Sequence, residues 1–284
     1  MGGPTPPLAA PPTAAPPAAA KRRPSRDFAH LIPMVLVAVG FLAIWEAVVR
    51  LDLFFPKEYS YLFPGPAAVG TALVDLWNRA ALIRSIGATL SRLAVGFLLS
   101  LVLGSILALL MVHFATFGKG IQPYVLGLQT FPSIAWVPLS IVWFGFSESS
   151  LLFVTIIGSL FAVTVSVADA LRTVPPIYLR AARNMGCDGM ELILRVTVPA
   201  TLPHLISSAK VGWSFAWRSL VGAEVIFATV GLGFLVESAS EAPNIAQVMA
   251  VMFVILLLGV VVDRVVFSRS QEWVNRRWGL STGK

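Results

Sequence analysis

Long apolar runs separated by short polar segments dominate the chain. Six of these runs are long enough to cross a membrane, since a transmembrane helix needs about 20 predominantly apolar residues. They cover approximately Leu31–Val49, Leu93–Phe114, Ile121–Phe144, Leu151–Leu171, Leu205–Ala228 and Ile245–Phe267. The runs are continuous rather than alternating, and backbone groups in lipid must be hydrogen-bonded within their own segment, which favours helices over a barrel. The pattern predicts an all-α, polytopic membrane protein with six transmembrane helices.

The N-terminal region has a different composition. Met1–Ala20 consists almost entirely of Pro, Ala, Gly and Thr, which leaves little to bury and favours polyproline II conformations. We therefore predict a disordered tail over residues 1–26 and a membrane domain over residues 27–284. The region does not fit a signal peptide, because its charges follow the tail and the next apolar run is long enough to remain as a span.

Small residues in the second run indicate how the helices pack. Gly96, Ser100, Gly104 and Ala108 recur every four residues. This spacing places them on one face of a helix, where small side chains let a neighbouring helix approach closely. The second run is therefore predicted to pack through this face.

The third run is more polar than a purely structural helix needs to be. It contains Gln129 and Ser133, together with prolines at positions 123, 132 and 138. Prolines and polar groups are tolerated in a span where neighbouring helices or a water-filled cavity satisfy the freed backbone groups. Two interpretations stay open, a kinked packing helix and a helix that lines a solute path.

The fifth run contains two charged residues at membrane depth, Arg218 and Glu224. Each costs about 3 kcal/mol on insertion scales, so such groups usually face the bundle interior or a cavity. Arg218 shares a stripe with Ser214 and Gly222, and it either lines a solute path or pairs with a carboxylate or a carbonyl group. A structural role is favoured for Glu224. The candidate path residues are Gln129, Ser133, Ser214, Arg218 and Glu224.

The composition agrees with a membrane protein. The chain is 57% hydrophobic and 12% charged, with a mean hydropathy of +0.81, whereas soluble domains carry about 25% charged residues. The net charge of +7 reflects cations that orient the helices rather than a nucleic-acid partner. Basic residues before the first run place the N-terminus in the cytoplasm, and the six spans return the C-terminus there. Arg84 and Arg92 are assigned to the outer side, before the second run.

The sequence gives no support for catalysis in this chain. Cys187 is the only cysteine, so no intrachain disulfide can form. The histidines are scattered without metal-ligand spacing, and no G-x-x-x-x-G-K-[ST] loop is present to bind ATP. We predict no enzymatic activity, no metal site and no cofactor in this chain.

A polar segment of about residues 172–203 separates the fourth and fifth runs. Its first half suits a short helix that ends in a turn at Gly186. Asp188 and Glu191 have the spacing of a capping box, which predicts a second helix over about Gly189–Arg195. The result is a cytoplasmic helical hairpin, which either docks into a groove on a partner or lies on the lipid surface.

This segment resembles the loop motif of binding-protein-dependent ABC importer permeases, Glu-Ala-Ala-x3-Gly-x9-Ile-x-Leu-Pro. The matching residues, with the family spacing throughout, are Arg180, Ala181, Ala182, Gly186, Val196, Val198 and Pro199. Arg180 departs from the family pattern, which usually has Glu at that position. The resemblance covers about Leu31–Trp278.

Further stretches are similar to the nitrate, sulfonate, taurine and bicarbonate branch of these permeases. They are LFPGP, SIGATLSRLAVGF, SIAWVPLSIVWFG, AWRSLVGAEV and GLGFL, in that order along the chain. Together they are more specific than the hairpin motif alone.

The resemblance implies the type I ABC importer permease fold in a multi-pass protein of the bacterial inner membrane. It implies a second permease copy, two ATPase subunits that bind ATP and Mg, an external substrate-binding protein and a small anionic solute. The residues implied to couple the hairpin to the ATPase are Arg180, Ala181, Ala182, Gly186, Asp188, Gly189, Met190, Glu191 and Pro199. A self-sufficient channel or secondary transporter is the alternative, and a membrane-embedded enzyme is a weaker third.

Overall fold

A computed structural model describes residues 31–51 and 62–277. Every regular element in these residues is helical, as the sequence predicts, and the predicted tail lies outside them. α1 (Leu31–Arg50) is a 20-residue helix that coincides with the first predicted span. It belongs mainly to the first of two compact units, residues 1–47, and the remaining elements belong to the second unit, residues 48–284.

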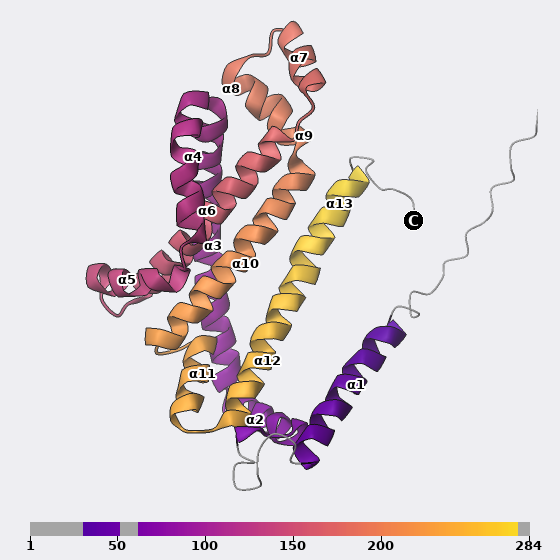
Figure 1. Ribbon diagram of the computed structural model, residues 1–284, viewed down its shortest axis with the longest axis vertical. Coiled ribbons are helices and arrows are strands. Elements are labelled where there is room, and N and C mark those ends of the chain that lie inside the picture. The colour runs from indigo at the N-terminus through magenta and orange to yellow at the C-terminus, as the bar shows by residue number, and fades with distance from the viewer. Residues whose placement is uncertain (1–30, 52–61, 278–284) are drawn as a thin grey trace, which may run out of the picture. The chain divides into compact units, whose positions relative to one another are not determined.

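The second unit is built from helices of very different lengths (Figure 1). In chain order they are α2 (Pro66–Asn78), α3 (Ala81–His113), α4 (Ala115–Thr130), η3 (Ser133–Trp136), α5 (Val137–Phe144), α6 (Glu148–Arg172), α7 (Pro176–Asn184), α8 (Gly189–Leu192), η4 (Ile193–Thr197), α9 (Val198–Ala200), α10 (Leu202–Phe227), α11 (Leu232–Glu241), α12 (Ile245–Val262), η5 (Asp263–Ser268) and α13 (Arg269–Arg277). α2 begins at the last residue of the LFPGP stretch.

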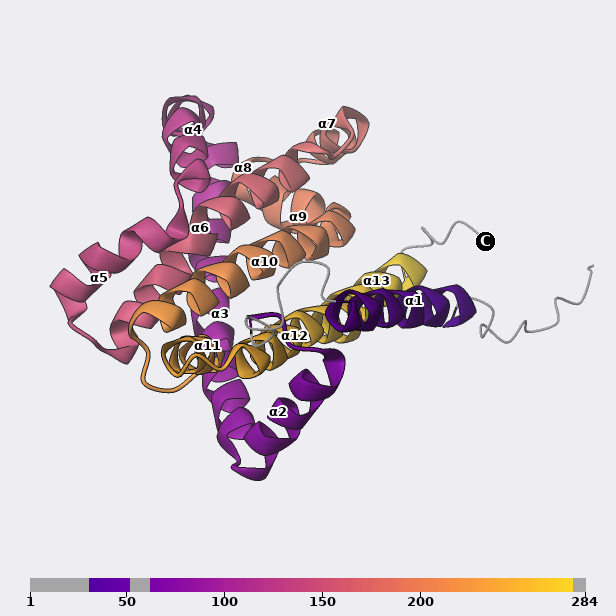
Figure 2. The same cartoon turned by 60° about the horizontal axis from the view of Figure 1, so that its bottom comes forward.

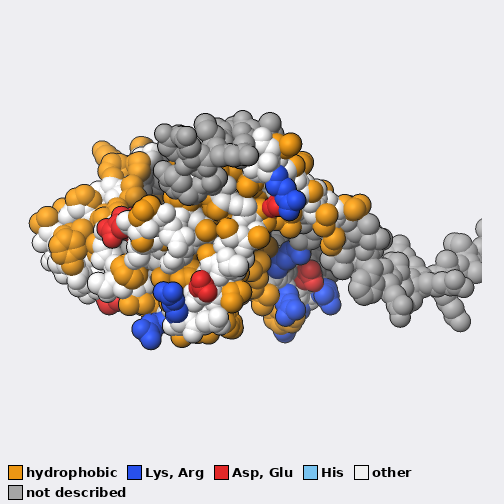
Figure 3. Space-filling view, turned by 90° about the horizontal axis from the view of Figure 1, so that it is seen from below, with side chains coloured by type: hydrophobic (Ala, Val, Ile, Leu, Met, Phe, Trp, Pro, Cys, Tyr) orange, Lys and Arg blue, Asp and Glu red, His pale blue; other side chains and the backbone are white. Residues whose placement is uncertain are grey.

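Three helices of the described residues are long and apolar enough to cross a membrane: α3, α6 and the continuous run Ile245–Arg277. Two bent pairs pass the same test together, α4 with the following Ser133–Phe144 segment, and Gly189–Ala200 with α10, which gives up to five spans. Hydrophobic side chains also cover much of the surface seen in Figure 3, with few charges between them. The protein is therefore a polytopic membrane protein.

α6 packs against both α3 and α10 (Figures 1 and 2), and small residues set the distance between the helices. A Cβ atom added to Gly104 would lie 2.8 Å from Cγ1 of Val163 and 2.9 Å from the carbonyl oxygen of Leu160. Ser100 and Ala108 on the same face are completely buried. The small face predicted for the second run is confirmed as a packing surface.

The second predicted span begins too late in the sequence. It was expected at Leu93, whereas α3 begins at Ala81 and carries Arg84 and Arg92 within the helix. The expectation that Arg92 lies before the second span is therefore wrong. A span predicted from hydropathy alone ends where an arginine interrupts the apolar run. Arg92 is nevertheless buried within the helix, because it has acidic partners, which are described below.

The third predicted span is broken rather than gently kinked. α4 and the Ser133–Phe144 segment meet at 96°, and Figure 2 shows them diverging from the break. Pro123 lies inside α4 without interrupting it, whereas Phe131 and Pro132 are extended. A residue before proline avoids the helical conformation, so Pro132 accounts for the position of the break.

The polar segment between α6 and α10 folds as the predicted helical hairpin, with its turn at Gly186. α7 ends in a Schellman motif, in which the Gly186 amide donates to the Arg183 carbonyl at 2.9 Å and the Cys187 amide donates to the Ala182 carbonyl at 3.0 Å. Gly186 has a φ of +84°, a conformation that favours glycine. The hairpin lies at the end of the bundle opposite α11 (Figure 1).

The second helix of the hairpin differs from its prediction in two respects. Asp188 precedes α8 but its side chain does not cap the helix, and its carboxylate lies instead 3.9 Å from Arg183. Glu191 pairs with Arg195 at 2.8 Å, so the predicted capping box is not formed. Helical turns also continue beyond Arg195 through η4 and α9 to Ala200.

The close packing of α3 against α6 predicts that a larger side chain at this face destabilises the protein. We expect Gly104→Val to destabilise the protein by about 1–3 kcal/mol, because the added atoms overlap the backbone of α6. Gly87→Val on the same helix is the control, since nothing lies within 4 Å of a Cβ atom there. The midpoint of thermal unfolding in detergent measures both, and equal midpoints for the two variants would contradict the packing account.

Candidate functional site

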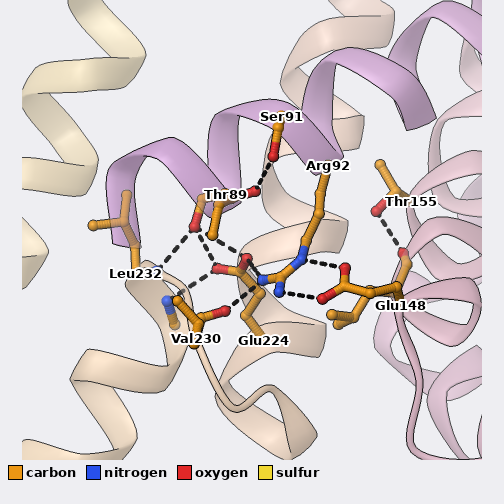
Figure 4. Close-up of polar contacts among 11 residues, drawn as sticks. Thr89, Ser91, Arg92, Glu148, Thr155, Glu224, Val230 and Leu232 are labelled. Carbon is orange, nitrogen blue, oxygen red and sulfur yellow. Dashed lines mark hydrogen bonds and ion pairs between the residues drawn. The ribbon is translucent and has the colours of Figure 1, made fainter. Parts of the chain in front are cut away.

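The most extensive polar contacts of the bundle centre on Arg92 (Figure 4). We call Thr89, Arg92, Glu148 and Glu224 the Arg92 cluster. Thr89 and Arg92 lie about one turn apart on α3, Glu148 begins α6, and Glu224 lies in the last turn of α10. The cluster therefore connects three long helices that are distant in the sequence.

Arg92 binds two carboxylates at once. Its Nη1 donates to Glu224 at 2.8 Å, and its Nε and Nη2 donate to the two oxygens of Glu148 at 2.6 Å and 2.5 Å. Nη1 also donates to the Val230 carbonyl. The planar guanidinium suits this bidentate contact in a way that lysine does not. The side chain of Arg92 is 9% exposed and that of Glu224 is 0% exposed, whereas that of Glu148 is 64% exposed.

Glu224 has further partners that fix the start of α11. The Thr89 hydroxyl donates to the carboxylate at 2.8 Å and 3.0 Å, and the Gly233 amide donates to it at 3.2 Å. Thr89 Oγ1 in turn accepts from the Leu232 amide at 2.9 Å. Both oxygens of this buried carboxylate are therefore hydrogen-bonded, which is what a buried charge requires.

Two glycines make room for the Glu224 side chain. A Cβ atom on Gly231 would lie 2.5 Å from the carboxylate, and the residue has a φ of +148°. A Cβ atom on Gly233 would lie 2.6 Å from the Val221 carbonyl oxygen. The GLG sequence therefore lets the loop before α11 close directly over the buried acid.

This arrangement gives Glu224 a structural role, the one favoured by the sequence, since its side chain is buried and fully bonded. Arg92, its partner, was missed. A signal for it exists in the sequence: Ser85, Thr89 and Arg92 continue the stripe of Gly96 and Ser100 toward the start of α3, and all five are buried. If the predicted span had been extended along this stripe of small and polar residues, beyond the start of the apolar run, it would have included Arg92.

Arg218 has a different environment from Glu224. It is exposed, its Nε donates to the Ser214 carbonyl on the same helix at 3.2 Å, and its guanidinium lies 4.6 Å from the centre of the Phe215 ring. No carboxylate pairs with it among residues 31–51 and 62–277. Of the two structural partners considered from the sequence, the backbone carbonyl is the one observed.

Ser214 shares α10 with Arg218, whereas Ser133 and Gln129 lie on separate elements. Ser133 is in η3 and faces α6, where a Cβ atom on Gly158 would lie 2.9 Å from its own Cβ. Gln129 is near the end of α4, and its Oε1 is buried without a hydrogen-bond partner in the described part of the chain. Within residues 31–51 and 62–277, no hydrogen bond joins either residue to Arg218.

The hairpin presents a mixed apolar and basic surface. Tyr178, Met185 and Met190 are exposed hydrophobic residues, and Arg180 is exposed beside them. Ala182 is 2% exposed and packs inside the hairpin. Of the other coupling residues, Ala181, Gly186, Asp188, Gly189 and Glu191 are exposed and Pro199 is half-buried. Gly189 has a positive φ of +59°, which the sequence analysis did not anticipate.

Metal chemistry finds no support in the described residues, where no group of three His, Cys, Asp or Glu side chains could hold an ion. The described residues form helices of membrane length, with the Arg92 cluster at one end and an exposed hairpin at the other. Residues 100–279 match the family described as binding-protein-dependent transport system inner membrane component. The chain belongs to this family.

Individual relatives point the same way. A putative ABC transporter permease protein of Methanocaldococcus jannaschii is 32% identical over 62% of this chain and 66% of its own length. The nitrate import permease protein of Synechococcus elongatus is 25% identical over 86% of this chain and 88% of its own length. The taurine transport system permease protein of Escherichia coli is 26% identical over 81% of this chain and 85% of its own length.

The fold also matches a solved structure. An inward-facing structure of the MetNI methionine ABC transporter aligns with a TM-score of 0.63, covering 68% of this chain and 96% of that chain at 19% identity. The chain therefore has the type I ABC importer permease fold expected from the sequence.

The Arg92 cluster predicts a large effect of removing its cation. We expect Arg92→Gln to destabilise the protein by about 3–5 kcal/mol, because Glu224 would stay buried without its counter-charge. Arg84→Gln, at an exposed position of the same helix, is the control and should change stability little. Replacing both Arg92 and Glu224 by Met should restore part of the loss. An Arg92→Gln variant with the thermal midpoint of Arg84→Gln would rule out this account.

Proposed function

We propose that the chain is the permease subunit of an ATP-driven importer, that it works as a pair of copies with two ATPase subunits, and that it moves a small anionic solute delivered by an external binding protein. The supporting observation is the family match over residues 100–279, which includes the exposed hairpin and α10. The orientation proposed from the positive-inside rule places both termini in the cytoplasm of a bacterial inner membrane.

The hairpin is the proposed contact for the ATPase. The hairpin connects the end of α6 to the start of α10. A force applied to it therefore acts on both of these helices, which pack against each other in the bundle. Exposed Tyr178, Met185 and Met190 supply apolar contact area, and the Gly186 turn fixes the angle between α7 and α8. ATP and Mg would be bound by the partner, and this chain would contribute the hairpin alone.

The proposed anionic substrate rests on two observations. Relatives named for nitrate and taurine import are similar over more than four fifths of this chain. Arg218 is exposed on α10 without a carboxylate partner in the described residues, so its guanidinium can bind an oxyanion in a bidentate manner. Another relative is named for formylaminopyrimidine transport, so the family relationship alone does not select an anion.

A self-sufficient channel or secondary transporter gains no support. Secondary transporters commonly use intramembrane carboxylates as proton or ion sites. The buried carboxylate here, Glu224, is instead held by Arg92, Thr89 and Gly233. Such a fully bonded acid has no free position for a transported ion.

A substitution at the turn of the hairpin tests the proposed contact with the ATPase. Gly186→Val should introduce backbone strain of about 1 kcal/mol or more at a positive φ, and should weaken co-purification of the ATPase while membrane insertion stays normal. Gly127→Val is the matched control, because both glycines have nothing within 4 Å of an added Cβ atom but only Gly186 has a positive φ. ATPase association that is equal in the two variants counts against the proposed contact.

Arg218 tests the anion path. Arg218→Gln should fold with normal yield, since the side chain is exposed, and should reduce uptake of the substrate in reconstituted vesicles. Lys should restore uptake in part, because it keeps the charge but loses the bidentate fork. The affinity of the binding protein for its ligand is the control and should not change. Unaltered uptake by Arg218→Gln at normal yield would exclude Arg218 from the path.

A further inference from the structure

A groove lies between α10 and the C-terminal helix run, separate from the Arg92 cluster and from the hairpin. Its volume is about 330 Å³. One wall comes from a single face of α10, including Lys210, Trp213 and Trp217, and the other from Gly259, Asp263 and Arg264. We call it the α10–α12 groove.

Polar contacts join α10 to the C-terminal helix run at one end of the groove. Lys210 Nζ lies 2.8 Å from Asp263 Oδ1, and Gln271 donates to the Ser207 hydroxyl at 3.4 Å. Asp263 begins η5, a π-helical stretch, and such insertions are frequent at functional sites. The polar end of the groove therefore has a fixed geometry.

The charge at this end is positive overall. The Lys210–Asp263 pair is neutral, and Arg264 adds a cation that is exposed and has no carboxylate partner within residues 31–51 and 62–277. Lys210 is also 47% exposed, which leaves ammonium hydrogens available to a further acceptor. Two cationic groups can therefore approach the same anion.

The position of Arg264 along its helix suits the headgroup level of a lipid bilayer. Arg264 follows Ile245 by 19 residues along one helical run, which corresponds to about 28 Å at 1.5 Å per residue. This is close to the hydrocarbon thickness of about 30 Å. If Ile245 lies at one boundary of the hydrocarbon layer, Arg264 lies at the other.

The walls become apolar away from the charged end. Trp213 and Trp217 stack with ring centroids 6.4 Å apart and an interplanar angle of 21°. Gly259 lies opposite them, since an added Cβ atom would come to 4.0 Å from Trp217 Nε1. A cationic end followed by an aromatic, apolar channel has the polarity of a phospholipid with an anionic headgroup.

We propose that the α10–α12 groove binds one anionic phospholipid from the surrounding bilayer. Its phosphate lies against Arg264 and Lys210, and one acyl chain runs along Trp217 and Gly259. Basic pockets between membrane helices are suited to anionic lipid headgroups. This lipid would join α10 to the C-terminal helix run, and the proposal does not depend on which solute is transported.

Brominated lipids test the site directly, since bromine in an acyl chain quenches nearby tryptophan fluorescence. We would titrate the full-length protein in detergent with dibrominated phosphatidylglycerol and dibrominated phosphatidylcholine. We expect saturable quenching by the anionic lipid at lower concentration. The saturable component should be reduced in Trp217→Phe, where Trp213 remains as a reporter, and lost in Gly259→Leu, which fills the groove. Size-exclusion profiles and thermal midpoints would establish that these variants fold.

The second part of the experiment tests whether lipid binding depends on the positive charge of the groove. Arg264→Gln should weaken binding of the anionic lipid about fivefold, the equivalent of ~1 kcal/mol for one basic residue near a membrane surface. Arg269→Gln, an exposed arginine of α13 outside the groove lining, is the matched control and should have little effect.

Three outcomes would overturn the proposal. The first is equal binding of the two lipids, and the second is equal binding by Arg264→Gln and Arg269→Gln. The third is displacement of the lipid by inorganic phosphate alone, which would indicate a site for free anions. A groove filled by a second copy of the chain would leave no saturable quenching in the unsubstituted protein, and that result would equally count against the lipid.

Discussion

A charged carboxylate with no exposed surface lies inside this apolar bundle, and the position of several helices follows from satisfying it. Burial disfavours a charged carboxylate, and Glu224 is compensated by Arg92 at 2.8 Å and by hydroxyl and amide donors that complete its hydrogen bonds. Those donors come from α3 and from the start of α11. The acid therefore holds α3, α10 and α11 together at one end of the bundle, while Glu148 adds α6 through the same arginine.

The opposite end of the same helices carries the hairpin. α6 and α10 pack closely over their length through small residues, as where Gly158 faces Ser219 and Gly212 faces Val163. Displacement of the hairpin therefore acts on helices whose far ends are fixed by the Arg92 cluster. Rigid packing of this kind transmits movement rather than absorbing it, which is what the proposed coupling to an ATPase requires.

The sequence predicts the local features well and the long-range ones less well. The small face of α3 and the Gly186 turn follow from spacing and backbone chemistry within a few residues, and both are confirmed. The Arg92–Glu224 pair joins residues 132 positions apart, and no local pattern specifies such a partner. The capping box failed for a related reason: Asp188 and Glu191 have the right spacing, but nearby arginines compete for both carboxylates.

The central claim is that this chain forms the membrane-spanning part of an ATP-driven importer, and the composition of the native complex tests it most directly. We would purify the complex through this chain from membranes that also contain its ATPase and measure its mass under native conditions. The account predicts two copies of this chain with two ATPase subunits. A stable single chain that supports uptake in vesicles without ATP would contradict it.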